Sequence, residues 1–185
     1  MGNICKAYIQ QTWFDGQNYA KGSVVDILED YNIAVIEFPF KKNPKAKSLP
    51  SRDWAGTDGL DVYVPVDGLP VNSYDLEVTF IYKGTEETIR EDLSKFIDFL
   101  YGRIPGRNSD SIQSGRLTVY DEHVGMGRKD VVVSEVDNEL FYCSEYDTDA
   151  VAKFKVKFTV YDPVTDVWLA KANGVVTNLS WGQWG

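Results

Sequence analysis

The side chains that could act as nucleophiles, bases or thiol ligands are few in this sequence. His123, in the segment YDEHVGMG, is the single histidine, and no serine sits in the glycine-flanked elbow that serves hydrolases. Cys5 and Cys143 lie far apart and form no CxxC pair, so two free thiols are expected. One histidine and two distant cysteines also do not reach the ligand set of a common zinc site.

Carboxylates are more numerous, but their spacing selects no chemistry. They gather in two turn-rich segments, DWAGTDGLD and EYDTDA, as Asp53, Asp58, Asp61, Glu145, Asp147 and Asp149. Neither segment has the alternating ligands and closing glutamate of a calcium loop, and nothing marks two carboxylates as a glycosidase pair. The glycine-rich stretches lack the Lys-Ser/Thr ending of a phosphate loop. The sequence therefore predicts a protein that is not an enzyme, with no cofactor and no metal.

The five tryptophans are a second group of candidates. Trp181 and Trp184 lie near the end of the chain, and Trp13, Trp54 and Trp168 are spread along it. Indole rings can stack on sugars, but they also bury large areas in cores and interfaces. Core or interface use is the favoured interpretation, and a sugar-stacking pair, Trp181 with Trp184, is the alternative.

A lysine-rich stretch, KKNPKAK, is the densest basic feature. Lys41, Lys42, Lys45 and Lys47 surround Pro44. Lysine and proline both discourage strand pairing, so an exposed loop or a sheet edge is expected. A site for phosphate or for an acidic partner is the alternative.

The bulk composition bounds the function further. The chain has 185 residues, 43% of them hydrophobic, and a formal net charge of −9 with a pI near 4.6. This length and apolar content fit a single folded domain. The acidic balance argues against a surface that binds duplex DNA, because such a surface must neutralise phosphates. No apolar run approaches the length of a membrane span, so no membrane contact is expected.

Most of the predicted elements are β-strands. In YDLEVTFIY and VAKFKVKFTVYD, apolar and polar residues alternate strictly, which indicates antiparallel strands with one wet face. The turn DPVT is expected to fold DVWLAKA back on the second of these as a hairpin. The other predicted strands are CKAYIQQTWF, SVVDIL, IAVIEF, LDVYVPV, RLTVYDE, DVVVSEV and ELFYCSE, with a further one near VVTNLSW.

One segment, about residues 85–101, has the periodicity of a helix. Thr85 is the expected N-cap, with Glu86 and Glu87 in the first turn, and Gly102 ends the pattern. The apolar face of this predicted helix consists of Ile89, Leu93, Phe96, Ile97 and Leu100.

Strands, one helix and more strands in this order predict a mostly β (α+β) fold, an antiparallel β-sandwich or open barrel with one packed α-helix. The chain is expected to form a single domain over 1–185, with extensions at about residues 1–30 and 175–185. A long polar linker, GRIPGRNSDSIQSG, follows the helix.

A family resemblance rests on this element order and on two short motifs. The turn LPSRDWAGTDG carries Pro50, Arg52 and Asp53, and the strand FKVKFTVYDP ends in the dipeptide Asp162-Pro163. Together they resemble the N-terminal domain of bacteriophage distal tail proteins, and more widely the tail-tube fold, over about residues 30–170. That family commonly has Pro-Gly-Arg-Asp-Gly at the turn, whereas here Ser51 replaces the first glycine and the next glycine is delayed to Gly56.

The resemblance implies a structural phage or prophage tail protein that assembles into a ring, usually hexameric, between the tail tube and the baseplate or tip. Its partners would be its own copies and other phage tail proteins, with DNA only passing through the channel. It would be located in the virion tail, and in the bacterial host cytoplasm during assembly.

The resemblance also implies that two long loops, residues 40–61 and 102–115, reach adjacent subunits. The implied subunit-interface residues are Lys41, Lys42, Lys45, Lys47, Arg52, Asp53, Trp54, Arg103 and Arg107. Trp54 would anchor in a neighbour's pocket. The alternative function is a non-catalytic carbohydrate-binding β-sandwich that uses Trp181 and Trp184.

Overall fold

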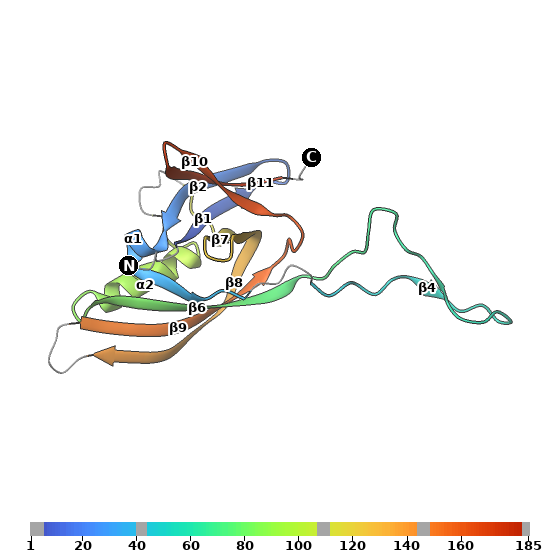
Figure 1. The fold of residues 1–185 in the computed structure, drawn as a ribbon, viewed down its shortest axis with the longest axis horizontal. Helices are drawn as coiled ribbons and strands as arrows, with labels where there is room; N and C mark the ends of the chain where they lie inside the picture. Colours follow the sequence, from blue (N-terminus) through green and yellow to red (C-terminus); the bar gives the residue numbers. More distant parts are fainter. Residues whose placement is uncertain (1–5, 40–43, 107–111, 144–148, 183–185) are drawn as a thin grey trace.

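The computed structural model describes residues 6–39, 44–106, 112–143 and 149–182, with the side chains of 138–143 left out. Its main feature is a seven-stranded antiparallel sheet in the order β2-β1-β7-β8-β9-β6-β3 (Figure 1). Its strands are β1 (Ala7–Phe14), β2 (Tyr19–Asp26), β3 (Ile33–Glu37), β6 (Tyr74–Thr85), β7 (Leu117–Asp121), β8 (Met126–Cys143) and β9 (Asp149–Val160).

Two small sheets and two helices complete the fold. The sheets are the hairpin of β10 (Val167–Ala172) with β11 (Val175–Trp181), and the short pair β4 (Ser51–Arg52) with β5 (Asp61–Val62). The helices are α1 (Ile27–Tyr31) and α2 (Ile89–Leu100), of which only α2 is long. The expected fold class, mostly antiparallel β with one substantial packed helix, is confirmed. Within the described residues, neither helix has the length and apolar character that a membrane crossing requires.

The two strands with the clearest sequence alternation lie side by side at the centre of the fold. β6 pairs with β9 over its whole length, from Tyr74 opposite Val160 to Thr85 opposite Asp149. The inward side chains of both strands are buried, and the lysines of β9 lie on the other face, as predicted. There Lys155 and Lys157 form ion pairs with Glu77 at 3.4 Å and Asp75 at 3.1 Å.

Helix α2 covers the inner face of these strands through aromatic rings. Phe96 lies edge-on to Phe80 and Phe154, with ring centroids 5.7 and 6.1 Å apart, and Phe80 stacks on Phe154 at 5.5 Å. Tyr31 contacts Phe96 and Phe99 from the other side. The buried face of α2 therefore includes Phe99, which the predicted apolar face omitted.

The N-cap of this helix lies three residues later than predicted, at Thr88 instead of Thr85. Thr85 still belongs to β6, because its pairing with Asp149 extends the ladder that far. The N-cap is Thr88, whose side chain makes no capping bond, and the Tyr82 hydroxyl donates instead to Asp92 in the first turn at 2.9 Å. Glu86 therefore precedes the helix.

Helix α1 was predicted as part of a strand, SVVDIL. The structure ends β2 at Asp26, whose carboxylate accepts the backbone N–H groups of Leu28 and Glu29 and so caps a single helical turn. Asn32 ends that turn in the left-handed conformation at φ 55°. An aspartate followed six residues later by an asparagine was the signal for it.

The C-terminal half differs from the prediction in two further places. DVVVSEV and the first five residues of ELFYCSE form one strand, β8, in which irregularities between Val133 and Glu135 and between Asp137 and Leu140 absorb the polar break. Ser144 and Glu145 lie outside the described residues. β10 does not pair back on β9. It pairs with β11, and this hairpin packs on the outer face of the sheet around Tyr8, Val167 and Leu179.

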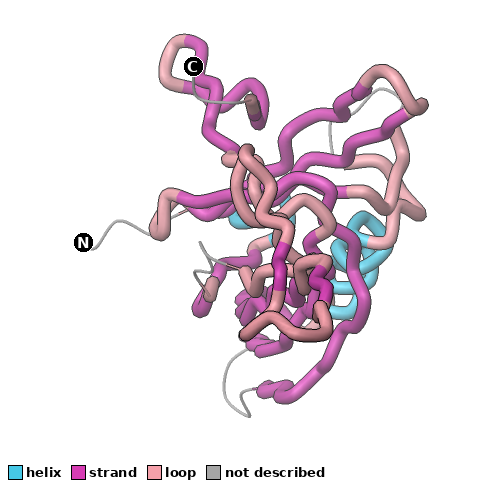
Figure 2. The backbone as a smooth tube through the Cα atoms, turned by 90° about the vertical axis from the view of Figure 1, so that its right-hand side faces the viewer, coloured by secondary structure: helices cyan, strands magenta, loops and turns pink. Residues whose placement is uncertain are grey.

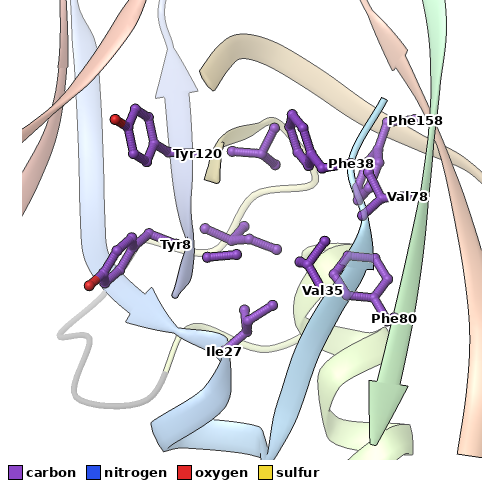
Figure 3. A pocket seen from close by; sticks show the side chains of 11 residues that line it. Tyr8, Ile27, Val35, Phe38, Val78, Phe80, Tyr120 and Phe158 are labelled. Atoms are coloured by element: carbon purple, nitrogen blue, oxygen red, sulfur yellow. The ribbon is translucent and has the colours of Figure 1, made fainter. Parts of the chain in front are cut away.

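The main sheet curls into an open barrel. Side chains of β1 and β7 meet those of β3, β6 and β9 around one apolar cavity of about 10 Å³, although β1 and β3 are far apart in the sheet order (Figure 3). Such a space holds at most about one water molecule, and its apolar walls give water no bonding partners. Strands from the two ends of the sheet order therefore contribute to one packed core.

Candidate functional site

A long arm, residues 44–73, projects from the barrel. It leaves the body after β3, carries β4 and β5, and returns at the start of β6 (Figure 1, right). Figure 2 views the molecule from the arm's side, with the helices packed against the strands behind it. None of the residues from 44 to 73 is buried.

The arm is a thin ribbon of two antiparallel chain segments. Near the body, the N–H of Lys47 donates to the Pro70 carbonyl at 2.8 Å, and the N–H of Asn72 donates to the Lys45 carbonyl at 2.9 Å. Farther out, Tyr63 N–H donates to the Pro50 carbonyl at 3.0 Å. These few bonds hold the segments together without a covering layer.

The turn motif SRDWAGTDG occupies the outer part of the arm. The Arg52 guanidinium lies 3.8 Å from the centre of the Trp54 ring, and the N–H of Thr57 donates to the Trp54 carbonyl at 3.2 Å. The delayed glycine, Gly56, has φ 92°, which other residues rarely adopt. Arg52 and Trp54 are thus brought together, and the turn belongs to a projecting element.

Exposed apolar side chains are concentrated on the returning segment of the arm. Leu60 is 61% exposed and Val66 is 99% exposed, and Val62 and Val64 between them are also exposed. These four residues recur at every second position, the spacing that would place their side chains on one face if the segment were paired along its length as a strand. We call them the apolar stripe.

The predicted strand LDVYVPV, which contains the apolar stripe, is wrong for most of its length. Only Asp61–Val62 is paired, as β5, because only the two-residue β4 lies beside it within the described chain. A two-stranded ribbon is marginally stable in water unless a further strand or a packed layer covers its apolar face. The arm therefore has a strand pattern that none of the described residues covers.

The remaining predicted interface residues are dispersed. Lys41, Lys42 and Arg107 lie outside the described residues, and Lys45 and Lys47 are exposed near the base of the arm. Arg103 lies on the body after α2, where its guanidinium pairs with Asp98 at 3.0 Å and lies 5.0 Å from the Tyr101 ring. Asp53 is exposed in the outer arm.

The ring of Trp181, one of the two sugar-stacking candidates, contacts its own chain. The Lys21 ammonium lies 3.5 Å from its centre, and Tyr19 meets it edge-on at 5.4 Å. Lys21 also donates to the Leu179 carbonyl at 2.9 Å, which fixes β11 against β2. Trp184 lies outside the described residues.

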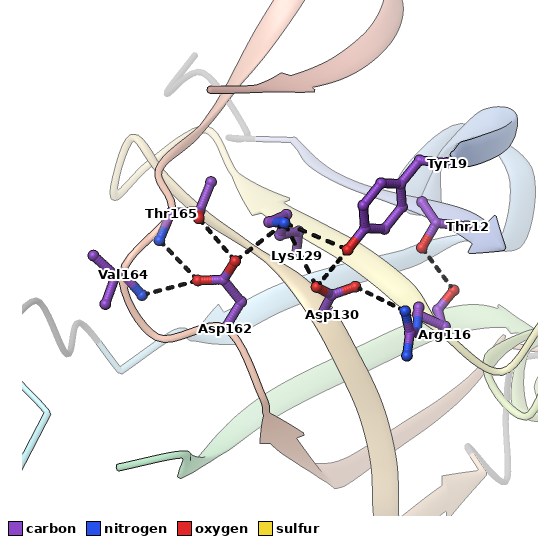
Figure 4. Close-up of polar contacts among 8 residues, drawn as sticks. All are labelled: Thr12, Tyr19, Arg116, Lys129, Asp130, Asp162, Val164 and Thr165. Carbon is purple, nitrogen blue, oxygen red and sulfur yellow. Dashed lines mark hydrogen bonds and ion pairs between the residues drawn. The ribbon is translucent and has the colours of Figure 1, made fainter. Parts of the chain in front are cut away.

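A network of charges next to Trp181 joins three parts of the body (Figure 4). Lys129 pairs with Asp162 at 3.1 Å and with Asp130 at 3.6 Å, and Tyr19 donates to Asp130 at 2.9 Å. Arg116 lies 3.5 Å from the other Asp130 oxygen. Two cations face two carboxylates, so the network is balanced and fastens β2 and β8 to the loop before β10.

Two groups of this network, Lys129 and Tyr19, have pKa values that are raised by their surroundings. Burial acts to lower the pKa of Lys129, but Asp162 and Asp130 outweigh burial and the pKa is raised. Burial and the bond to Asp130 raise the pKa of Tyr19. Lys129 therefore stays charged and Tyr19 neutral, and neither is a proton acceptor at pH 7.

The described residues bring together no group of three histidine, cysteine or carboxylate side chains suited to a metal ion. The sequence reasoning missed the apolar stripe as a site. Its signal was present in LDVYVPV, which was predicted only as one more β-strand.

Comparisons with known proteins give a likeness to solved structures. No family model matches the sequence. No curated protein matches it either. The fold is similar to the crystal structure of the SPP1 Dit (gp 19.1) protein, described as a paradigm of the hub adsorption apparatus in phages that infect Gram-positive bacteria. The two chains are 17% identical with a TM-score of 0.46, and the match covers 88% of this chain and 52% of the other, so this chain spans about half of that protein's length.

Proposed function

We propose that the chain is a structural subunit of a phage or prophage tail, which self-assembles into a ring between the tail tube and the baseplate or tip. The observation that carries the self-assembly is the arm. It holds the apolar stripe away from the described body of its own chain, where a neighbouring molecule would cover it. The kind of assembly follows from the resemblance of the turn motif, the element order and the Asp162-Pro163 ending to distal tail proteins.

A second copy is the occupant we propose for the arm. The arm is the connection of the β3–β6 pair, and it points away from the barrel (Figure 1). Contacts from one surface to a different surface of the next copy close into rings when the rotation closes. In such a ring no arm is left uncovered, because each subunit both gives an arm and receives one.

The predicted interface residues on the arm are part of this proposal. Trp54, with Arg52 over its ring, would insert into the neighbour, since aromatic and arginine side chains commonly dominate interfaces. Lys45 and Lys47 would face carboxylates of an acidic neighbour. Arg103, on the body, would belong to the receiving surface.

The test compares two valine substitutions with the same chemistry. Val64→Asp places a charge in the stripe, and Val175→Asp places one on an equally exposed valine of the C-terminal hairpin. We expect both variants to melt like the parent, because exposed substitutions change stability by about 0.5 kcal/mol or less. Light scattering over a concentration series should show assembly for the parent and Val175→Asp and only monomer for Val64→Asp, with annuli in negative-stain images of the first two.

A parent that stays monomeric up to millimolar concentration would refute self-assembly. Equal assembly of parent and Val64→Asp would refute the stripe as its contact. Glycan binding by a monomer would favour the carbohydrate-binding module instead.

A further inference from the structure

The strongest further feature is a buried guanidinium at the root of the arm. Arg128, in β8, is 1% exposed, the largest fully buried side chain in the described residues. Its Nε donates to the Tyr74 hydroxyl at 3.3 Å, and its Nη1 donates to Asp166 at 3.2 Å and to the Gly127 carbonyl at 2.9 Å. One side chain thus contacts the residue that ends the arm and the residue that precedes β10.

These three acceptors lie on β6, on β8 itself and in the loop before β10. Tyr74 is the first residue of β6, immediately after the arm. Asp166 immediately precedes Val167, which begins the C-terminal hairpin. Gly127 precedes Arg128 in β8, and a Cβ there would come within 2.9 Å of the Val167 Cβ, so hairpin and sheet are in close contact at this point.

A buried arginine is a costly way to gain stability. Removing a guanidinium from water costs several kcal/mol, and apolar residues of similar volume often stabilise a fold as well or better. Its advantage is directional, because the planar fork donates several bonds in fixed directions and so fixes the positions of the groups that accept them. Half-exposed Asp166 could pair with water, yet it lies against this fork.

We infer that Arg128 is a positioning residue that sets the direction of the arm relative to the C-terminal hairpin. The inference deepens the proposed function and rests on it for its purpose, since a ring closes only if every arm leaves its subunit at the same angle. The geometry itself belongs to the single subunit. It is therefore measurable whether or not rings form.

The experiment measures the spread of arm directions with two spin labels. Lys47→Cys near the base of the arm and Val175→Cys on the hairpin would carry the labels, in a parent in which Cys5 and Cys143 are replaced by serine. Labelled protein is diluted with unlabelled protein, so that only distances within one subunit are read. The variants are Arg128→Met, Tyr74→Phe and Asp166→Ala.

A matched control separates direction from general damage. Arg116→Met makes the same substitution at an arginine that pairs with Asp130 and not with Tyr74 or Asp166. We expect a narrow distance distribution in the parent and in Arg116→Met, and a distribution at least twice as wide in the three variants. Arg128→Lys should fall between, because an ammonium can reach one acceptor but cannot span all three.

Two results would overturn the inference: a broad distribution in the parent, or parent-like distributions in the variants. If Arg128→Met does not fold, Tyr74→Phe and Asp166→Ala decide, since each removes one acceptor from a partly exposed position. A parent that never assembles but shows this pattern would refute the proposed function and leave the positioning role intact. If rings form normally and the distance distributions are the same in all variants, the proposed function is supported and the positioning role of Arg128 is refuted.

Discussion

At the scale of single residues, Asp162 shows how the body is fastened. Its carboxylate accepts the N–H groups of Val164 and Thr165 and the Thr165 hydroxyl, and it pairs with Lys129. Burial by itself would raise its pKa, but these bonds outweigh burial and lower the pKa below the ordinary 3.8. The carboxylate is therefore stabilised in its charged form by the fold.

The first prediction concerns acid. A group whose pKa is lowered on folding stabilises the protein above its unfolded pKa, and this stability is lost as the pH falls through the folded pKa. Asp162→Asn should lower the free energy of unfolding at pH 7 by about 1.5–3 kcal/mol, the range for a hydrogen-bonded charged group. Urea titrations should show the difference shrinking below about pH 4, and a constant difference down to pH 2 would contradict it.

The second prediction contrasts a buried with an exposed apolar side chain. Phe96 is fully buried between β6, β9 and α1, whereas Leu60 is exposed on the arm. Phe96→Ala should cost about 3–5 kcal/mol in the isolated subunit, and Leu60→Ala about 0.5 kcal/mol or less. Denaturation of both variants checks this, and a large cost for Leu60→Ala would mean that the arm packs on its own body.

At the scale of elements, the sequence predicted the structure best where the burial of one face sets the periodicity of a single strand or helix. The alternation in β6 and β9 and the apolar periodicity of α2 each follow from one buried face, and the structure has both. The errors lie where the tertiary pairing decides. Thr85 continues a strand because Asp149 is its partner, and DVWLAKA pairs with β11 because the main sheet offers its outer face to the hairpin.

The candidate site was the least predictable part for a related reason. The residues Arg52 and Trp54 were identified, but their place on an arm depends on the missing cover of LDVYVPV, which local patterns do not reveal. Arg128 gave no signal at all, because a lone arginine in a strand usually points to solvent. Its burial follows from Tyr74 and Asp166, far away in the sequence.

The third prediction removes the arm. Replacing residues 48–69 by a short glycine-serine link joins two segments that are already hydrogen-bonded, Lys47 to Pro70. Because none of the removed residues is buried, the body should keep its stability, and each halving of the loop should add about 0.6 kcal/mol through a lower closure entropy. Thermal unfolding and light scattering should give a folded monomer, whereas an unfolded product would show that the arm is needed for folding.

At the scale of the whole molecule, two forces act on assembly in opposite directions. In the proposed assembly, the formal charge of −9 would make copies repel one another, while the apolar stripe would attract them. Salt screens the first force, since the screening length falls from about 10 Å at 0.1 M to about 3 Å at 1 M, and leaves the second in place.

The fourth prediction follows from this balance. Assembly should strengthen as sodium chloride is raised from about 0.1 to about 0.5 M, because the repulsion weakens first. Sedimentation at several salt concentrations measures it, with Val64→Asp as the variant that stays monomeric throughout. Assembly that weakens with salt would indicate that Lys45, Lys47 and Arg52, rather than the stripe, hold the copies together.

The attachment of the arm has a consequence for how such subunits diversify. β3 and β6 are neighbours in the sheet, and the arm is the connection between them, so it is an enlarged hairpin loop. Insertions, deletions or whole replacements at that point leave every ladder of the barrel intact. Changes in this loop would thus alter how far the arm extends and what it contacts, while the barrel stays the same. This makes the loop a suitable graft point for engineering subunits of altered spacing.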